Sequence, residues 1–113
     1  MTLARPFRLS GATTLRQLFE KGRTVRASSF LLRYLPNQYG RNRLAVMVPR
    51  SVSPKAVVRN RWRRIISEQL KDFFQNGAGW DVAVVASPTI LKKPLAESKS
   101  ELQQAIRKII VKP

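Results

Sequence analysis

The segment from Lys55 to Gln75 constrains the fold more than any other part of the chain, because its two sides have opposite character. Plotted at 100° per residue, its apolar side chains fall within one arc and most of its cations fall on the other side. A helix of this kind must bury its apolar side against other elements. The apolar arc consists of Val58, Trp62, Ile65, Ile66, Leu70 and Phe73. The opposite side consists of Arg59, Asn60, Arg63, Arg64, Ser67 and Lys71, with Arg61 near the border.

The segments on either side of this helix supply the elements that can receive it. Trp80–Ala86 has enough apolar residues to form a strand that is buried on both faces of a sheet. Shorter apolar runs predict strands over Ser29–Leu35 and Leu44–Val48, and the turn residues between them predict an antiparallel hairpin. Amphipathic patterns predict two more helices, over Ser10–Glu20 and Leu95–Ile110. The order predicts a single α+β domain over residues 1–113 with a small sheet.

Positive charge is concentrated in the part of the chain that contains the arginine-rich helix. Residues 1–67 carry fifteen Lys and Arg against one acid, Glu20, whereas residues 68–113 carry seven against five. Thirteen of the fifteen are arginines, which suit bidentate phosphate contacts and stacking on bases. A solvated helix face usually mixes both signs of charge. The run from Arg59 to Arg64 therefore predicts a nucleic-acid partner.

The acids and the missing histidines argue against catalysis by the protein itself. The chain has no histidine, the usual acid and base in metal-independent RNA cleavage. Glu68 and Asp72 are four residues apart and could hold a metal, but pairing with Arg64 and Lys71 explains their spacing more simply. We therefore predict no catalytic residue and no metal site. Three further acids are expected to pair locally or to lie on an exposed helix side: Asp81, Glu97 and Glu101.

The composition also indicates the cellular compartment in which the protein works. The chain has no cysteine, which excludes disulfides and thiolate metal sites and fits a reducing cytosol. No apolar run approaches the roughly 20 residues of a membrane span, and no secretory pattern is recognisable at the start. We expect a cytoplasmic protein without a membrane partner.

The segment Arg43–Arg64 resembles the signature of the bacterial ribonuclease P protein component. In that family an apolar strand is followed by a short basic crossover, an Ala-containing helix start and an Arg-Asn-Arg/Lys-x-Lys/Arg-Arg motif, here Arg59 to Arg64. Phe19-Glu20-Lys21-Gly22, Phe30 and Asp81–Ala86 also match family positions, so the resemblance covers nearly the whole chain. It implies a two-layer α–β sandwich with a four-stranded mixed sheet. It also implies that the arginine-rich helix makes a left-handed crossover between parallel strands, against the usual hand.

The resemblance implies a function as well. The family's protein binds a large catalytic RNA, which uses magnesium, and the 5′ leader of precursor tRNA, and the holoenzyme removes that leader. The protein itself is then non-catalytic, and magnesium is bound mainly by the RNA. Matching positions predict contacts to the RNA subunit from Arg50, Lys55, Arg59, Asn60, Arg61, Arg63 and Arg64. They predict contacts to the leader from Leu15, Phe19, Phe30 and Arg33.

Some positions depart from the family pattern, and other functions remain open. Leu15 replaces a frequent Phe, Arg33 falls where some members have Tyr, and Ser67 replaces an Arg, which raises the question of weaker RNA contacts. A ribosomal or other structural RNA-binding protein would share the charge and the lack of catalytic groups. A DNA-binding regulator would need duplex recognition and usually a dimer, for which the sequence shows no obvious face. A self-sufficient nuclease is the least favoured alternative.

Overall fold

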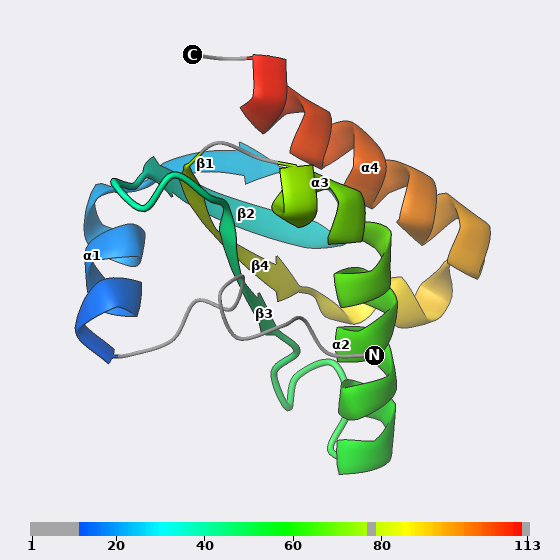
Figure 1. Ribbon diagram of the computed structural model, residues 1–113. Coiled ribbons are helices and arrows are strands. Elements are labelled where there is room, and N and C mark those ends of the chain that lie inside the picture. The colour runs from blue at the N-terminus through cyan, green and yellow to red at the C-terminus, as the bar shows by residue number, and fades with distance from the viewer. Residues whose placement is uncertain (1–11, 77–78, 112–113) are drawn as a thin grey trace.

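The computed structural model describes residues 12–76 and 79–111, which form one small sheet with helices on both of its faces (Figure 1). In chain order the elements are α1 (Ala12–Lys21), β1 (Arg23–Arg26), β2 (Phe30–Pro36), β3 (Arg43–Met47), α2 (Ala56–Gln69), α3 (Lys71–Asn76), β4 (Trp80–Ala86), the 3₁₀ helix η2 (Pro88–Lys92) and α4 (Leu95–Val111). The start of the predicted first helix, Ser10 and Gly11, lies outside the described residues.

The four strands lie in the order β1-β2-β4-β3. β2 is antiparallel to both β1 and β4, whereas β3 is parallel to β4, so the sheet is mixed as expected. The predicted hairpin of β2 with β3 is wrong, because β4 lies between them. The register places Val84 of β4 opposite Leu32 on one side and Val46 on the other. α2 and α3 therefore connect two parallel neighbours, and the left hand of this crossover stays a prediction.

Two layers of side chains hold the helices on the sheet. The larger core lies between one face of the sheet and α2, α3 and α4. Its fully buried members include Leu32, Leu44, Ile66, Leu70, Phe74, Val82, Val84, Leu102 and Ile109. The smaller core lies on the opposite face, where Leu18 of α1 packs on Ala45 and Ala83. Figure 1 shows α1 separated from the other helices by the sheet.

The predicted helix from Lys55 to Gln75 is two helices, α2 and α3, that meet at Leu70. The Leu70 side chain is buried against the sheet. Side chains of other elements reach carbonyl groups beside the break. Gln103 Nε2 of α4 donates to the Gln69 carbonyl, and Asn42 Nδ2 donates to the Phe73 carbonyl at 3.0 Å. The tertiary structure therefore contributes hydrogen bonds at a helix boundary that the apolar periodicity does not reveal.

Gly22 directly follows α1 and ends it. Its backbone N–H donates to the Leu18 carbonyl at 2.9 Å. A Cβ atom at Gly22 would lie only 2.3 Å from that same oxygen, so a side chain would force the helix end to move. The glycine lets the chain turn directly into β1. The sequence patterns missed β1, which is short and has Val25 as its only strongly apolar residue.

Candidate nucleic-acid interface

The arginine-rich side of α2 faces away from the sheet. Ile66 is fully buried, and the side of the helix opposite to it, which carries Arg61 and Arg64, is exposed. Arg59 precedes Ile66 by about two turns and therefore lies on the same side as Ile66, so the prediction that places Arg59 opposite the apolar arc is wrong. Asn60, Arg61 and Arg64 are exposed, whereas Arg59 and Arg63 are half-buried. We call these five residues the α2 arginine face. The predicted RNA-contacting residues of the helix thus spread around its accessible surface and do not lie on one narrow side.

The α2 arginine face makes few contacts within the protein. Arg59 Nη1 donates to the Ser53 carbonyl at 3.0 Å, and Arg63 Nη1 donates to Asn60 Oδ1. Within residues 12–76 and 79–111, none of its arginines forms an ion pair with a carboxylate. The first turn of α2 contains no acid either. The positive charge of this face is therefore not neutralised by the described part of the chain.

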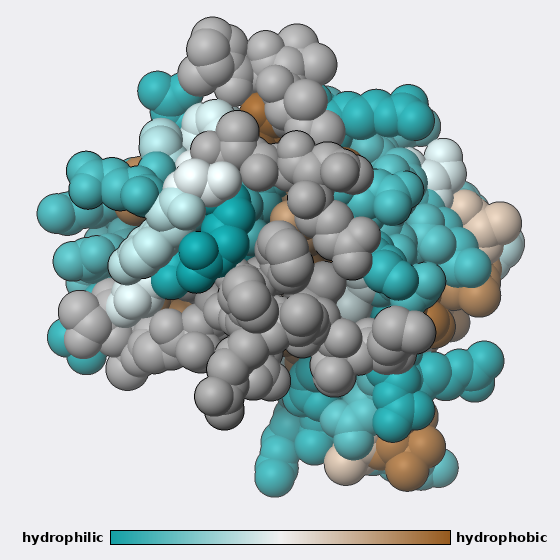
Figure 2. Space-filling model, in the orientation of Figure 1, coloured by the Kyte–Doolittle hydropathy of each residue, from teal (hydrophilic) through white to brown (hydrophobic). Residues whose placement is uncertain are grey.

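The segment before α2 extends the basic surface. Arg50 and Lys55 are exposed, whereas Val52 and Ser53 between them are buried and anchor the segment. The Lys55 N–H donates to Ser53 Oγ at 3.2 Å. Figure 2 shows hydrophilic residues around the N-terminal end of α2, with a small hydrophobic area among them. Val57 in that first turn is 79% exposed, whereas its neighbour Val58 is half-buried.

Three of the four predicted leader-binding residues lie on the α1 side of the sheet. Arg33 Nη1 donates to Thr24 Oγ1 at 2.7 Å, and its Nη2 donates to the Phe19 carbonyl. The Arg33 guanidinium carbon lies 5.9 Å from the centre of the Phe19 ring, and Phe19 is 36% exposed. Leu15 packs against the smaller core. Arg33 therefore ties the end of α1 to the sheet and also lies next to an accessible aromatic ring.

Phe30, the fourth predicted leader-binding residue, lies elsewhere. Its side chain is 3% exposed and belongs to the larger core, on the face covered by α2, α3 and α4. Residues of β2 alternate between the faces, so Phe30 points opposite to Arg33. The sequence-based grouping of Phe30 with Phe19 is corrected here, because the ring has no accessible face on which a base could stack.

An ion pair that sequence reasoning missed joins the starts of β3 and β4. Arg43 Nε and Nη2 donate to the two carboxylate oxygens of Asp81 at 2.8 and 2.7 Å. Asn37 Nδ2 donates to Asp81 Oδ1 at 2.7 Å. The hydrogen bond to Asp81 outweighs burial and raises the pKa of Arg43. Asp81 thus pairs across the sheet and not locally, and only the parallel register of β3 with β4 could have revealed the pair.

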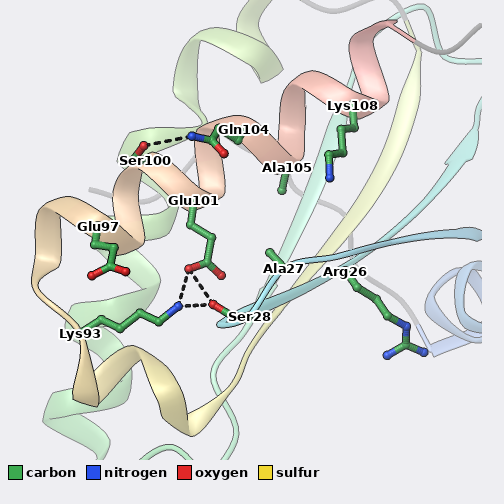
Figure 3. Close-up of a pocket in the computed structure, with 10 residues that line it drawn as sticks. All are labelled: Arg26, Ala27, Ser28, Lys93, Glu97, Ser100, Glu101, Gln104, Ala105 and Lys108. Atoms are coloured by element: carbon green, nitrogen blue, oxygen red, sulfur yellow. Dashed lines mark hydrogen bonds and ion pairs between the residues drawn. The ribbon is translucent and has the colours of Figure 1, made fainter.

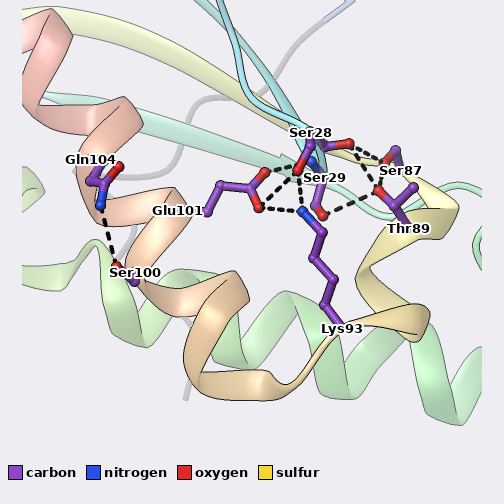
Figure 4. Close-up of polar contacts among 8 residues, drawn as sticks. All are labelled: Ser28, Ser29, Ser87, Thr89, Lys93, Ser100, Glu101 and Gln104. Atoms are coloured by element: carbon purple, nitrogen blue, oxygen red, sulfur yellow. Dashed lines mark hydrogen bonds and ion pairs between the residues drawn. The ribbon is translucent and has the colours of Figure 1, made fainter.

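A second polar cluster links α4 to the turn between β1 and β2 (Figure 4). Lys93 Nζ lies 2.8 Å from Glu101 Oε2, and Ser28 Oγ donates to the same oxygen at 3.1 Å. The Ser29 N–H donates to Glu101 Oε1. Burial acts to raise the pKa of Glu101, but these hydrogen bonds outweigh it and lower the pKa. The prediction that Glu101 lies on an exposed side is therefore wrong, whereas Glu97 is exposed.

This cluster borders a cavity of about 490 Å³ between α4 and the end of β1 (Figure 3). Glu97, Glu101, Gln104 and Lys108 of α4 line it, together with Arg26 at the end of β1. Acidic and basic side chains both line the cavity, and two of them, Lys93 and Glu101, form an ion pair with each other. The cavity therefore lacks the one-sided charge of the α2 arginine face.

Metal binding and membrane insertion find no support in the part of the chain that the structure describes. Residues 12–76 and 79–111 hold no group of three or more acids, histidines or cysteines placed to bind an ion. No helix in the same ranges has both the length and the apolar character that a membrane crossing requires.

Comparisons with known proteins agree with the fold. The family model described as "Ribonuclease P" matches residues 3–110. The ribonuclease P protein component of Petrotoga mobilis is 31% identical over 114 residues, covering 98% of this chain and 94% of the relative. That of Nitrosococcus oceani is 31% identical over 90 residues, covering 80% of this chain and 76% of the relative.

Two solved structures show the same fold. The ribonuclease P protein of Staphylococcus aureus has a TM-score of 0.81 at 20% identity, covering 91% of this chain and 94% of that chain. The protein from Thermotoga maritima has a TM-score of 0.73 at 20% identity, covering 86% and 92%.

The fold and the family match together define a protein subunit of a ribonucleoprotein enzyme. The chain belongs to the ribonuclease P protein component family, whose members are part of the ribonucleoprotein that processes the 5′ ends of tRNAs.

Proposed function

We propose that the chain binds the catalytic RNA of ribonuclease P through the α2 arginine face, together with Arg50 and Lys55. The observation that carries the proposal is the uncompensated charge of this face: its arginines have no carboxylate partner among the described residues. Each guanidinium presents several N–H donors in a fixed plane, which suits phosphate oxygens. The rigid helix sets the spacing of these donors.

Asn60 and Val57 add contacts that do not depend on charge. Asn60 lies among the arginines and is exposed, so its amide can bond a 2′-hydroxyl or a base edge once Arg63 releases it. Val57 is the exposed apolar side chain at the start of the helix and can pack on a sugar or a base. These contacts would let the face distinguish a folded RNA from any polyanion.

The 5′ leader of precursor tRNA is proposed to bind on the α1 side of the sheet, at Phe19 and Arg33, beside Leu15. Phe19 supplies an accessible ring, and Arg33 lies next to it with a guanidinium fixed by Thr24. Stacking on aromatic rings is the usual way in which proteins hold unpaired bases. Phe30 takes no part in this site.

Magnesium is proposed to be held mainly by the RNA. Mg²⁺ prefers carboxylate and phosphate oxygens, and residues 1–67, which contain the α2 arginine face, carry one acid. The protein's part is to neutralise phosphate repulsion and to position the leader, and we place this work in the cytoplasm. Cleavage then depends on the RNA, so the protein contributes affinity and positioning.

Reconstitution tests the proposed function. The protein is mixed with ribonuclease P RNA and precursor tRNA at low magnesium, and removal of the 5′ leader is followed on a gel. We expect leader removal by the mixture and none by rigorously RNA-free protein. Cleavage by the protein alone, or no stimulation of the RNA, would contradict the proposal.

A pair of variants separates the two RNA surfaces. Arg59→Ala should weaken assembly with the RNA subunit even when no substrate is present. Phe19→Ala should leave assembly intact and weaken binding of precursor tRNA by the holoenzyme, by the roughly 1–3 kcal/mol typical of one stacked base. Mature tRNA, which lacks the leader, should bind the Phe19→Ala holoenzyme as it binds the wild type. Equal weakening for both tRNAs would exclude Phe19 from the leader site.

A further inference from the structure

The loop between β2 and β3 holds an aromatic ring out in solvent. Tyr39 is 57% exposed, the second most exposed large hydrophobic residue of the described chain after Val57. Its backbone N–H donates to Asn37 Oδ1 at 3.0 Å. Gly40 follows with φ +71°, a left-handed conformation that side chains other than glycine rarely adopt. The loop is therefore folded in a defined way and is more than a loose connection.

The ring is stacked against cations. The guanidinium carbon of Arg43 lies 4.1 Å from the centre of the Tyr39 ring, and that of Arg41 lies 5.8 Å from it. Arg43 cannot swing away freely, because both carboxylate oxygens of Asp81 hold it at 2.7 and 2.8 Å. A ring held in place in this way loses little freedom when a further flat group binds to it.

The base of the loop is tied to β4 by Asn37. Its Nδ2 donates to the Arg41 carbonyl at 3.1 Å and to Asp81 Oδ1 at 2.7 Å, and its backbone N–H donates to the Gly79 carbonyl at 2.8 Å. Asp81 thus organises the loop and pairs with Arg43, one of the two arginines at the ring.

We propose that Tyr39, with the guanidinium groups of Arg43 and Arg41 near its ring, is a stacking site for one unpaired RNA nucleotide. The Tyr39 ring takes the base, and the arginines attract the phosphate. The site is separate from the α2 arginine face and from Phe19 and Arg33. It rests on the proposed function in one respect, namely that the protein works on RNA. The nucleotide comes either from the ribonuclease P RNA or from precursor tRNA.

The test measures both sources with three substitutions of Tyr39. Affinity of the protein for ribonuclease P RNA is measured first, and affinity of the reconstituted holoenzyme for precursor tRNA second. Tyr39→Ala should weaken one of the two about 5- to 150-fold, the range expected for one stacked base. Tyr39→Phe, which keeps the ring, should stay within about twofold of the wild type. Tyr39→Leu keeps apolar volume without a ring and should behave like Tyr39→Ala.

Leu91→Ala is the matched control, because Leu91 is 51% exposed and belongs to neither proposed RNA surface. It should leave both affinities unchanged. Circular dichroism and the thermal midpoint check folding, and if Tyr39→Ala does not fold, the comparison of Tyr39→Leu with Tyr39→Phe decides. The affected affinity identifies the source of the nucleotide.

Two results would overturn the proposal. If Tyr39→Leu and Tyr39→Ala bind both RNAs like the wild type, the ring contacts no base. If Tyr39→Phe weakens binding as much as Tyr39→Ala, the hydroxyl and not stacking is responsible. Failure of the proposed function is distinct, because the wild type itself would then bind neither RNA, and Arg59→Ala would change nothing.

Discussion

α2 and α4 pack side by side on the same face of the sheet, yet they treat charge in opposite ways. Both bury an apolar side in the larger core, through Ile66 in α2 and Leu102 in α4. The outward side of α4 mixes acids and bases, and Glu101 is fixed by Lys93 and two serines. The α2 arginines have no such partner among the described residues. Charge in α4 contributes to the fold, whereas the α2 arginines form no ion pair with an acid in the described part of the chain.

The largest expected effect concerns the core that both helices cover. Phe30→Ala should lower the free energy of unfolding by about 3–5 kcal/mol, because a fully buried ring leaves a cavity. Urea denaturation measures the loss. Phe19→Ala is the control and should cost much less, since Phe19 is 36% exposed. If the Phe30→Ala protein is stable and binds precursor tRNA weakly, Phe30 contacts the leader after all.

A smaller effect is expected where α4 charge serves the fold. Glu101→Gln should cost about 1–2 kcal/mol at neutral pH, because a charged hydrogen-bond acceptor is lost from Lys93, Ser28 and Ser29. Urea denaturation at pH 7 gives this value. Glu97→Gln is the matched control, since Glu97 is exposed on the same helix and should tolerate the change.

The pH dependence of the same pair has a defined sign. The folded-state pKa of Glu101 is lowered, so its stabilisation is fully present above the unfolded-state pKa of about 4.3. It is lost as the pH falls through the lowered folded-state pKa. The stability difference between wild type and Glu101→Gln should therefore shrink on acidification from pH 6 towards pH 3. A constant difference over that range would mean that the Glu101 carboxylate contributes no charge-dependent stability.

The smallest effect on stability is expected for substitutions in the α2 arginine face, which are compared with substitutions in α4. Arg63→Ala combined with Arg64→Ala should change the free energy of unfolding by no more than about 0.5 kcal/mol. The same double variant should reduce the slope of log K against log salt for RNA binding by about one to two units. Arg107→Ala with Lys108→Ala removes equal charge from α4 and should leave the slope nearly unchanged. Equal changes of slope in the two double variants would remove the distinction between the helices.

The sequence predicted the elements better than their arrangement. The segments Lys55–Gln75 and Trp80–Ala86 were recognised because their periods and their apolar content are strong. The prediction of a β2–β3 hairpin rested on the rule that strands adjacent in sequence usually pair. It is wrong because β4 is buried on both faces and lies between β2 and β3. That burial was itself predicted from the sequence, and it is incompatible with an edge position for β4. The fourth strand, β1, is too short and too polar for a pattern to detect.

The candidate site was predictable where it depends on one helix and unpredictable where it depends on the sheet. Asn60, Arg63 and Arg64 follow from helical periodicity alone, whereas Arg59 and Arg61 lie on opposite sides of the helix. Phe30 was misplaced because family position says nothing about which face of β2 a side chain occupies. Arg43 and Asp81 are 38 residues apart, and only the parallel register brings them together. The contact of Tyr39 with Arg43 could not be predicted either, because it depends on the same Arg43–Asp81 pair.

The position of α2 between two parallel strands also bears on the order in which the protein forms. β3 can join the sheet only after β4 has been synthesised, because β4 is the strand with which it pairs. Residues 1–67, which carry most of the positive charge, therefore cannot complete their fold until residues far downstream are available. During that interval its arginines repel one another without the compact sheet to hold them. We expect polyanions such as RNA to accelerate folding by screening this repulsion. The RNA would then act on the protein first as a folding aid and only afterwards as a partner in the enzyme.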